Sequence, residues 1–197
     1  MMPNKKKRVP TNTKSDSKAQ VQLKTVSFAE LWAVYPGGNP YVDPKTGEPP
    51  PNFTNQCAIR LSVALHRVGI EMKSFQGEGR IRLSGKRTAV LVHEMADWLK
   101  LRPMAGMGRT ENMTDADWQT KIKGRTGIVA FKNYWQRDGE SGRSGGHIDL
   151  WNGSQMTSNG IRDTATNFLR FTLGSATGFG IYSDLGKSSE IVFWEIK

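Results

Sequence analysis

The order of patterns along the chain predicts an α+β domain in which N-terminal helices pack on an antiparallel sheet. Residues 28–35 and 56–69 carry apolar side chains at helical spacing. Residues 147–151 then alternate as a strand does, and residues 191–196 form an apolar run typical of a strand. A chain of 197 residues is long enough for one such domain with a tail.

Charge is distributed unevenly along the chain. The net charge is +10, and residues 1–24 hold seven Lys or Arg against one acid. This stretch is too poor in apolar residues to offset the entropy lost on ordering, so we expect residues 1–25 to be a basic disordered arm and residues 26–197 to be the folded domain. The excess of positive charge favours anionic partners.

Several classes of protein are excluded. No window approaches 18 consecutive apolar residues, so we expect no transmembrane segment. The basic N-terminus has no apolar stretch after it and therefore does not resemble a secretory signal peptide. The single cysteine, Cys57, cannot form an internal disulfide or a cysteine-based zinc site, and the sequence implies no metal and no cofactor.

The first half of the chain is predicted to be helical. Ser27 and Glu30 fit a capping box, and the helix they open ends before Pro36. Residues 36–54 form a long loop with six prolines, a length that is often functional. The further predicted elements are helices at 56–69, 88–101, 114–122 and 163–172, strands at 127–131, 147–151 and 191–196, loops at 103–113 and 137–146, and a hairpin turn at 152–153.

Cys57 is expected in the first turn of its helix, capped by Thr54 or Asn55. Unpaired N–H groups and the helix dipole at that position favour a thiolate and can hold an oxyanion. The alternative is a small buried hydrophobic residue, the usual role of a lone cysteine.

His147 is the candidate base by elimination. His66 lies on the opposite face of the Cys57 helix, and His93 lies off the apolar face of the next helix. His147 begins a strand directly after a glycine-rich loop, and Asp149, two residues on, shares its face of the strand. Asp149 could orient the imidazole as the third member of a triad, or it could be an ordinary strand aspartate.

Two segments resemble a known family. Asn55-Gln56-Cys57-Ala58-Ile59-Arg60-Leu61-Ser62 resembles the nucleophile helix of the fourth family of type VI secretion amidase effectors. Gly145-Gly146-His147-Ile148-Asp149-Leu150-Trp151-Asn152-Gly153 resembles that family's histidine strand. The resemblance covers roughly residues 26–196, and the pairing of the two motifs makes it specific.

The resemblance implies a papain-like fold of the NlpC type. It also implies a cysteine DL-endopeptidase that is made in the bacterial cytoplasm, delivered by the type VI machinery into the periplasm of a rival cell, and inhibited in its producer by a cognate immunity protein. The substrate would be the peptidoglycan stem peptide, cleaved between D-glutamate and diaminopimelate. Carried over to this sequence, Cys57 is the nucleophile and His147 the general base and acid.

The third catalytic member is less well defined by the resemblance. Relatives carry an acid about one hairpin after the histidine, where this sequence has Ser158 and Asn159 and no acid before Asp163. Any of these three residues, or Asp149, could fill the role. We choose Asp149 because strand geometry places it on the face of His147.

Two other functions remain open at this stage. The scaffold could support another cysteine-dependent reaction, such as transamidation or cleavage of a different isopeptide. The protein could instead bind nucleic acid through its basic arm, although nucleic acid is not the expected partner. Nucleic-acid binding would weaken steeply with salt and would need residues 1–24, whereas hydrolysis would survive their deletion and be lost on thiol alkylation.

Overall fold

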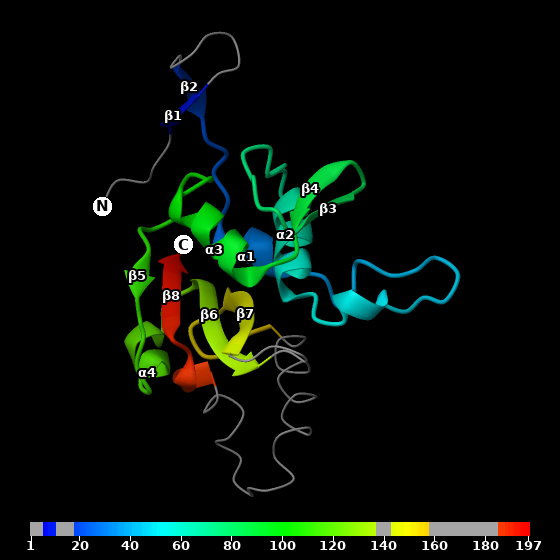
Figure 1. Ribbon diagram of the computed structural model, residues 1–197. Helices are drawn as coiled ribbons and strands as arrows, with labels where there is room; N and C mark the ends of the chain where they lie inside the picture. The colour runs from blue at the N-terminus through cyan, green and yellow to red at the C-terminus, as the bar shows by residue number, and fades with distance from the viewer. Residues whose placement is uncertain (1–5, 11–17, 137–142, 158–184) are drawn as a thin grey trace, which may run out of the picture.

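The centre of the protein is a four-stranded antiparallel sheet. The computed structural model describes residues 6–10, 18–136, 143–157 and 185–197. The sheet has the order β5-β8-β6-β7, with every neighbouring pair antiparallel (Figure 1). Its strands are β5 (Glu111–Asn112), β8 (Glu190–Glu195), β6 (Gly127–Gln136) and β7 (Arg143–Trp151).

Two apolar clusters occupy the two faces of this sheet. One cluster joins Ile128, Ile148 and Leu150 of the sheet to the helices α1 (Phe28–Ala33), α2 (Cys57–Arg67) and α3 (Val92–Lys100). The other joins alternate sheet residues to α4 (Trp118–Ile122) and the short 3-10 helix η2 (Leu185–Lys187). The middle of the sheet is therefore covered on both sides, and the predicted α+β class with helices on an antiparallel sheet is confirmed.

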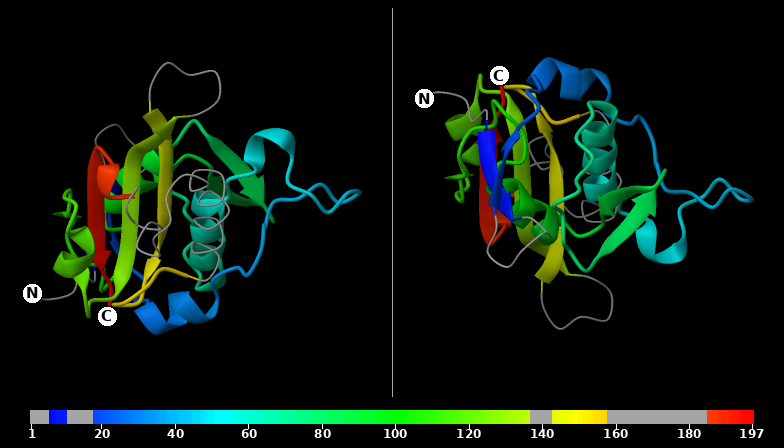
Figure 2. Two further views of the ribbon diagram at one scale, coloured as in Figure 1. Left: turned by 90° about the horizontal axis from the view of Figure 1, so that it is seen from below. Right: turned by 90° about the horizontal axis from the view of Figure 1, so that it is seen from above.

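Helix α2 lies alongside β7, the last strand in the order of the sheet (Figure 2). The predicted helix at 56–69 is observed as Cys57–Arg67. Its C-terminus is closed at Gly69, whose φ of +82° lets its N–H and that of Ile70 return to the last carbonyls of the helix. The capping box of Ser27 and Glu30 at the start of α1 is also present as predicted.

The predicted helix at 88–101 is wrong in its first part. The chain instead forms a hairpin of β3 (Arg80–Leu83) and β4 (Lys86–Ala89), and α3 begins only at Val92. The turn is Ser84-Gly85, with positive φ at both residues, which suits the twist of a two-residue hairpin. The helix expected from Thr114 likewise begins later, at Trp118.

In the second half of the chain the strands are longer than predicted. β6 extends to Gln136 and β7 begins at Arg143, so part of the expected loop at 137–146 is strand. After β7 the chain turns at Asn152 and makes one bridge, between Trp151 and Met156, and residues 152–157 contain no named strand. The helix expected at 163–172 lies outside the described residues.

The basic N-terminal segment contains a hairpin where the sequence predicts disorder. β1 (Lys6–Pro10) pairs antiparallel with β2 (Lys18–Gln22) as a separate two-stranded sheet (Figure 1). The composition of this segment reports its apolar content and not the pairing of its strands, so it did not indicate the hairpin. The division of the chain near residue 25 stays a prediction. Within the described ranges, no helix is both long and apolar enough to cross a membrane.

Candidate active site

Cys57 is the first residue of α2 and is 3% exposed. The cap differs from the expected one, because Gln56 holds the N-cap position without a side-chain capping bond. Asn55 contributes differently, since its Oδ1 accepts the N–H of Cys57 at 3.4 Å. The thiol thus lies in the first turn of the helix, where the N–H groups have no carbonyl partner within the helix.

The long loop at 36–54 is attached to the start of α2. Gln56 is fully buried, and its side chain makes two bonds to the backbone of Tyr41, accepting the Tyr41 N–H at 2.9 Å and donating to its carbonyl. One turn later, Arg60 donates to the Gly38 carbonyl at 3.2 Å and to Asn39 Oδ1 at 2.8 Å. These contacts place the loop beside the end of the helix that carries Cys57 (Figure 2).

His147 lies on β7 and is 4% exposed. Its cross-strand partner on β6 is Phe131, and the two rings stack with centroids 6.4 Å apart. Gly146 explains how β7 approaches so closely, since a Cβ there would lie 2.8 Å from the Phe131 carbonyl and 3.1 Å from Val92 of α3. The absence of a side chain at Gly146 thus lets β7 lie close to both β6 and α3.

Asp149 is fully buried on the same strand, two residues from His147. Its Oδ2 lies 3.7 Å from Nε2 of His147, within ion-pair range but beyond a hydrogen bond. That Nε2 is buried and has no hydrogen-bond partner among the residues that the structure describes. The carboxylate itself accepts the Leu150 N–H at 2.8 Å and the hydroxyl of Thr157 at 2.9 Å.

The electrostatics of His147 tie the three candidate residues together. Burial on its own lowers the pKa of His147, but the interactions of its side chain with Asp149 and Cys57 outweigh burial and raise the pKa to about 10. The imidazole is therefore a cation at neutral pH. Nε2 faces Asp149, so Nδ1 is the ring nitrogen that remains for the interaction with the Cys57 side chain.

The other two histidines take no part in this cluster. His93 is exposed on α3, as predicted. His66 is buried on α2, and its Nε2 lies 2.9 Å from the Arg87 carbonyl of β4. Ser158, Asn159 and Asp163, the alternatives to Asp149, lie outside the described residues.

Two residues near the cluster were missed in the sequence. Thr157 contacts Asp149 directly. Tyr35 follows α1, and burial followed by the negative charges of Asp149 and Cys57 raises its pKa well above the usual value. Its hydroxyl stays neutral and interacts with the carboxylate of Asp149. The helical spacing of apolar residues predicts only a packing position for Tyr35. No motif or periodicity in the sequence singles out Thr157.

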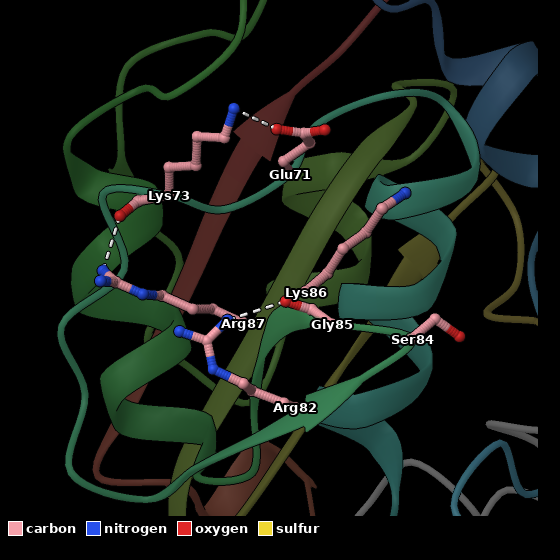
Figure 3. A pocket seen from close by; sticks show the side chains of 7 residues that line it. All are labelled: Glu71, Lys73, Arg82, Ser84, Gly85, Lys86 and Arg87. Carbon is pink, nitrogen blue, oxygen red and sulfur yellow. Dashed lines mark hydrogen bonds and ion pairs between the residues drawn. The ribbon is translucent and has the colours of Figure 1, made fainter.

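A separate cavity of about 420 Å³ lies at the β3–β4 hairpin (Figure 3). Its lining contains four cationic side chains and one acid, and none of the candidate catalytic residues. Arg87 is anchored by the carbonyls of Lys73 and Phe75, Arg82 by that of Gly85, and Lys73 pairs with Glu71. Across the described parts of the chain, no group of three or more His, Cys, Asp and Glu side chains could hold a metal ion.

Comparison with known proteins places the chain in a family. The family described as type VI secretion system (T6SS), amidase effector protein 4 (Tae4) matches residues 53–194, a range that contains Cys57, His147 and Asp149. Comparison with curated proteins gives no match.

Solved structures of this family have the same fold. The Tae4 effector of Salmonella typhimurium, solved with the immunity protein Tai4 of Enterobacter cloacae, is 21% identical, with a TM-score of 0.52 over 86% of this chain and 98% of that one. In the effector–immunity system Tae4/Tai4 of Salmonella typhimurium, the identity is 20% and the TM-score 0.54, and the match covers 87% of this chain and 98% of that one. The Tae4 effector of Enterobacter cloacae is 17% identical, with a TM-score of 0.52, and the match covers 90% of this chain and 100% of that one.

The helices and antiparallel sheet thus form a papain-like fold of the NlpC type, and the predicted fold is confirmed. The chain belongs to the family of type VI secretion amidase effectors 4. It is an antibacterial peptidoglycan amidase, as the resemblance of the two motifs implied, and an effector secreted into target cells.

Proposed function

We propose that the protein is a cysteine DL-endopeptidase that hydrolyses the amide bond between D-glutamate and diaminopimelate in peptidoglycan stem peptides. Cys57 is the nucleophile, His147 is the general acid and base, and Asp149 orients and stabilises the imidazolium. The observation that carries this proposal is the buried His147, which interacts with the Cys57 thiol and has Asp149 Oδ2 3.7 Å from its Nε2.

The proposed reaction has two steps. The Cys57 thiolate attacks the amide carbon, and N–H groups at the start of α2 hold the oxyanion that forms. The Cys57 N–H must leave its long bond to Asn55 to take part. The C–N bond breaks as the His147 imidazolium gives its proton to the leaving amine, which leaves a thioester. Water then loses a proton to His147 and attacks the thioester, releasing the carboxylic acid and the thiolate.

We also propose that the protein is made in the cytoplasm of its producer and delivered into the periplasm of a target cell. A cognate immunity protein would bind it in the producer. Support comes from two similar structures, which are complexes of Tae4 with Tai4. The loop at 36–54, tied to the start of α2 by Gln56 and Arg60, is the described segment best placed to line the substrate groove.

The test is to incubate the purified protein with soluble disaccharide tetrapeptides that contain diaminopimelate and to identify products by mass spectrometry. We expect fragments that end at D-glutamate. Cys57→Ala should reduce turnover about 10³-fold or more while keeping the fold. His93→Ala, which changes an exposed histidine on α3, is the matched control for His147→Ala and should retain full activity.

Each alternative outcome has a distinct meaning. Hydrolysis that persists in Cys57→Ala would rule out cysteine catalysis. Cleavage at another amide would correct the bond, and products joined to an added amine would identify a transamidase. Binding to nucleic acid that disappears on deletion of residues 1–24, without any cleavage, would favour the nucleic-acid hypothesis.

A further inference from the structure

Asp149 is held by more contacts than its place on β7 requires. Its Oδ1 accepts the N–H of Leu150 at 2.8 Å and the hydroxyl of Thr157 at 2.9 Å. The same hydroxyl oxygen lies 3.0 Å from Oδ2. A hydroxyl has a single proton to donate. Because the hydroxyl oxygen is about equally close to both carboxylate oxygens, that proton lies between them. The hydroxyl therefore opposes rotation of the carboxylate about its own axis.

This rotation matters because it decides what His147 faces. The terminal torsion of aspartate is broad and roughly two-fold, so the backbone alone does not define it. Oδ2 points at Nε2 of His147 from 3.7 Å, and within the described part of the chain that buried nitrogen has no hydrogen-bond partner. The gap is about 0.5 Å beyond hydrogen-bond range, and catalytic bonds of this kind commonly tighten when substrate binds.

Thr157 reaches Asp149 because of the turn that follows β7. Asn152 closes this turn, since its Oδ1 accepts the N–H groups of Ser154 and Gln155. The bridge between Trp151 and Met156 then brings the chain back beside β7, and Thr157 follows at once with 5% exposure. At this point of the chain the buried hydroxyl lies within hydrogen-bond distance of both oxygens of the Asp149 carboxylate.

We propose that Thr157 is a positioning residue for the reaction: its hydroxyl holds the Asp149 carboxylate so that one oxygen faces His147. The inference rests on the proposed function, because it assigns Thr157 a role through Asp149 and His147. If the hydroxyl only satisfied a buried polar group, its removal would change the stability of the protein, and variants that stay folded would keep the wild-type kcat.

The test compares Thr157→Val, which removes the hydroxyl at nearly constant size, with Thr157→Ser, which keeps it. Thr88→Val is the matched control, because Thr88 is also buried and donates its hydroxyl to the Lys86 carbonyl on β4. We expect Thr157→Val to lower kcat about 10- to 100-fold with KM little changed, as loss of an orienting partner does elsewhere. Thr157→Ser should restore most of the rate, and Thr88→Val should match the wild type.

A second readout needs no substrate. The rate at which iodoacetamide alkylates Cys57, followed against pH, reports the thiolate and the charge on its imidazole partner. The alkaline limb of this profile should move to lower pH in Thr157→Val and not in Thr88→Val. If Cys57→Ala still hydrolyses peptidoglycan, the proposed function fails, yet this profile still measures whether Thr157 acts on the pair.

A double-mutant cycle separates action through Asp149 from independent action. In an Asp149→Asn background, Thr157→Val should cost almost nothing further. If the losses in kcat from Asp149→Asn and Thr157→Val multiply in the double variant, the two residues act independently and the proposal is overturned. A Thr157→Ser variant no more active than Thr157→Val would also overturn it. Wild-type kcat and pH profile in a folded Thr157→Val would do the same. If Thr157→Val does not fold, Thr157→Cys, a weaker donor of similar size, should give an intermediate kcat, and a wild-type kcat there would count against the proposal.

Discussion

Phe131 and His147 lie directly opposite each other on β6 and β7, with ring centroids 6.4 Å apart and ring planes inclined by 27°. Phe131 is itself held from behind by Trp118, edge-on at 4.8 Å. The imidazole therefore rests against a buried aromatic stack that limits its rotation. In the proposed mechanism His147 exchanges protons through its ring nitrogens, so a contact that limits rotation of the ring would also position the general acid and base.

We expect Phe131→Leu to lower kcat more than it lowers stability. The substitution should reduce the free energy of unfolding by about 1–3 kcal/mol, as shape changes in a packed core do, and should free the His147 ring to rotate. Phe193→Leu is a suitable control, because Phe193 is fully buried in the same cluster and stacks on Arg125 instead. Urea unfolding and steady-state kinetics on both variants check this, and equal kcat values would show that the stack does not position His147.

The raised pKa of His147 predicts a pH-dependent stability. Its pKa in the folded protein is about 10, above the unfolded value of about 6.5. The charged form is therefore favoured by folding. Its stabilising contribution is fully present below about pH 6.5 and is lost as the pH rises toward 10.

Urea unfolding at pH 6, 8 and 10 measures this contribution. We expect the free energy of unfolding to fall across the series in the wild type and to fall less in His147→Gln. In Asp149→Asn the loss should begin at lower pH, because Asp149 helps to raise the pKa of His147. An identical pH dependence in the wild type and His147→Gln would show that His147 is not the titrating group.

How far the sequence predicts the site depends on the range of the interactions involved. The positions of Cys57 at a helix start and of His147 and Asp149 on one face of a strand follow from local periodicity, and both are observed. The roles of Tyr35 and Thr157 depend on contacts across the fold or across a turn, which no local pattern records.

The same distinction explains the hairpin of β3 and β4. Arg80, Ile81, Arg82 and Leu83 alternate over only four residues before the Ser84-Gly85 turn, and the apolar positions that follow fit a helix equally well. A long-range contact accompanies the strand conformation here: the Ala89 N–H donates to the Ser62 hydroxyl of α2, 27 residues away. The sequence does not indicate that contact.

Tyr35→Phe tests a second partner of Asp149. Burial, followed by the charges of Asp149 and Cys57, raises the pKa of Tyr35 well above its usual value, and its hydroxyl interacts with the Asp149 carboxylate. We expect a loss in kcat of about 10- to 150-fold, which corresponds to the roughly 1.5–3 kcal/mol of one hydrogen bond to a charged group. Tyr41→Phe is the control, since its backbone and not its hydroxyl binds Gln56. Equal rates for both variants would exclude the role.

Gln56→Ala should release the loop at 36–54 from the start of α2. The fully buried Gln56 side chain makes two hydrogen bonds to the Tyr41 backbone, and its truncation leaves both backbone groups without that partner. A loss of about 1–3 kcal/mol in the free energy of unfolding is expected for such groups. Hydrogen exchange should show faster exchange in residues 38–48, while the core of α2 keeps its protection.

The effect on catalysis distinguishes a groove wall from a distant loop. If the loop lines the substrate groove, Gln56→Ala should raise KM for stem peptides and leave alkylation of Cys57 unchanged, because the thiol and His147 keep their contacts. Gln76→Ala, a change in the segment before β3, provides the comparison for removing a glutamine side chain elsewhere. Faster exchange in the loop with an unchanged KM would place the loop outside the groove and leave its tether as a purely structural device.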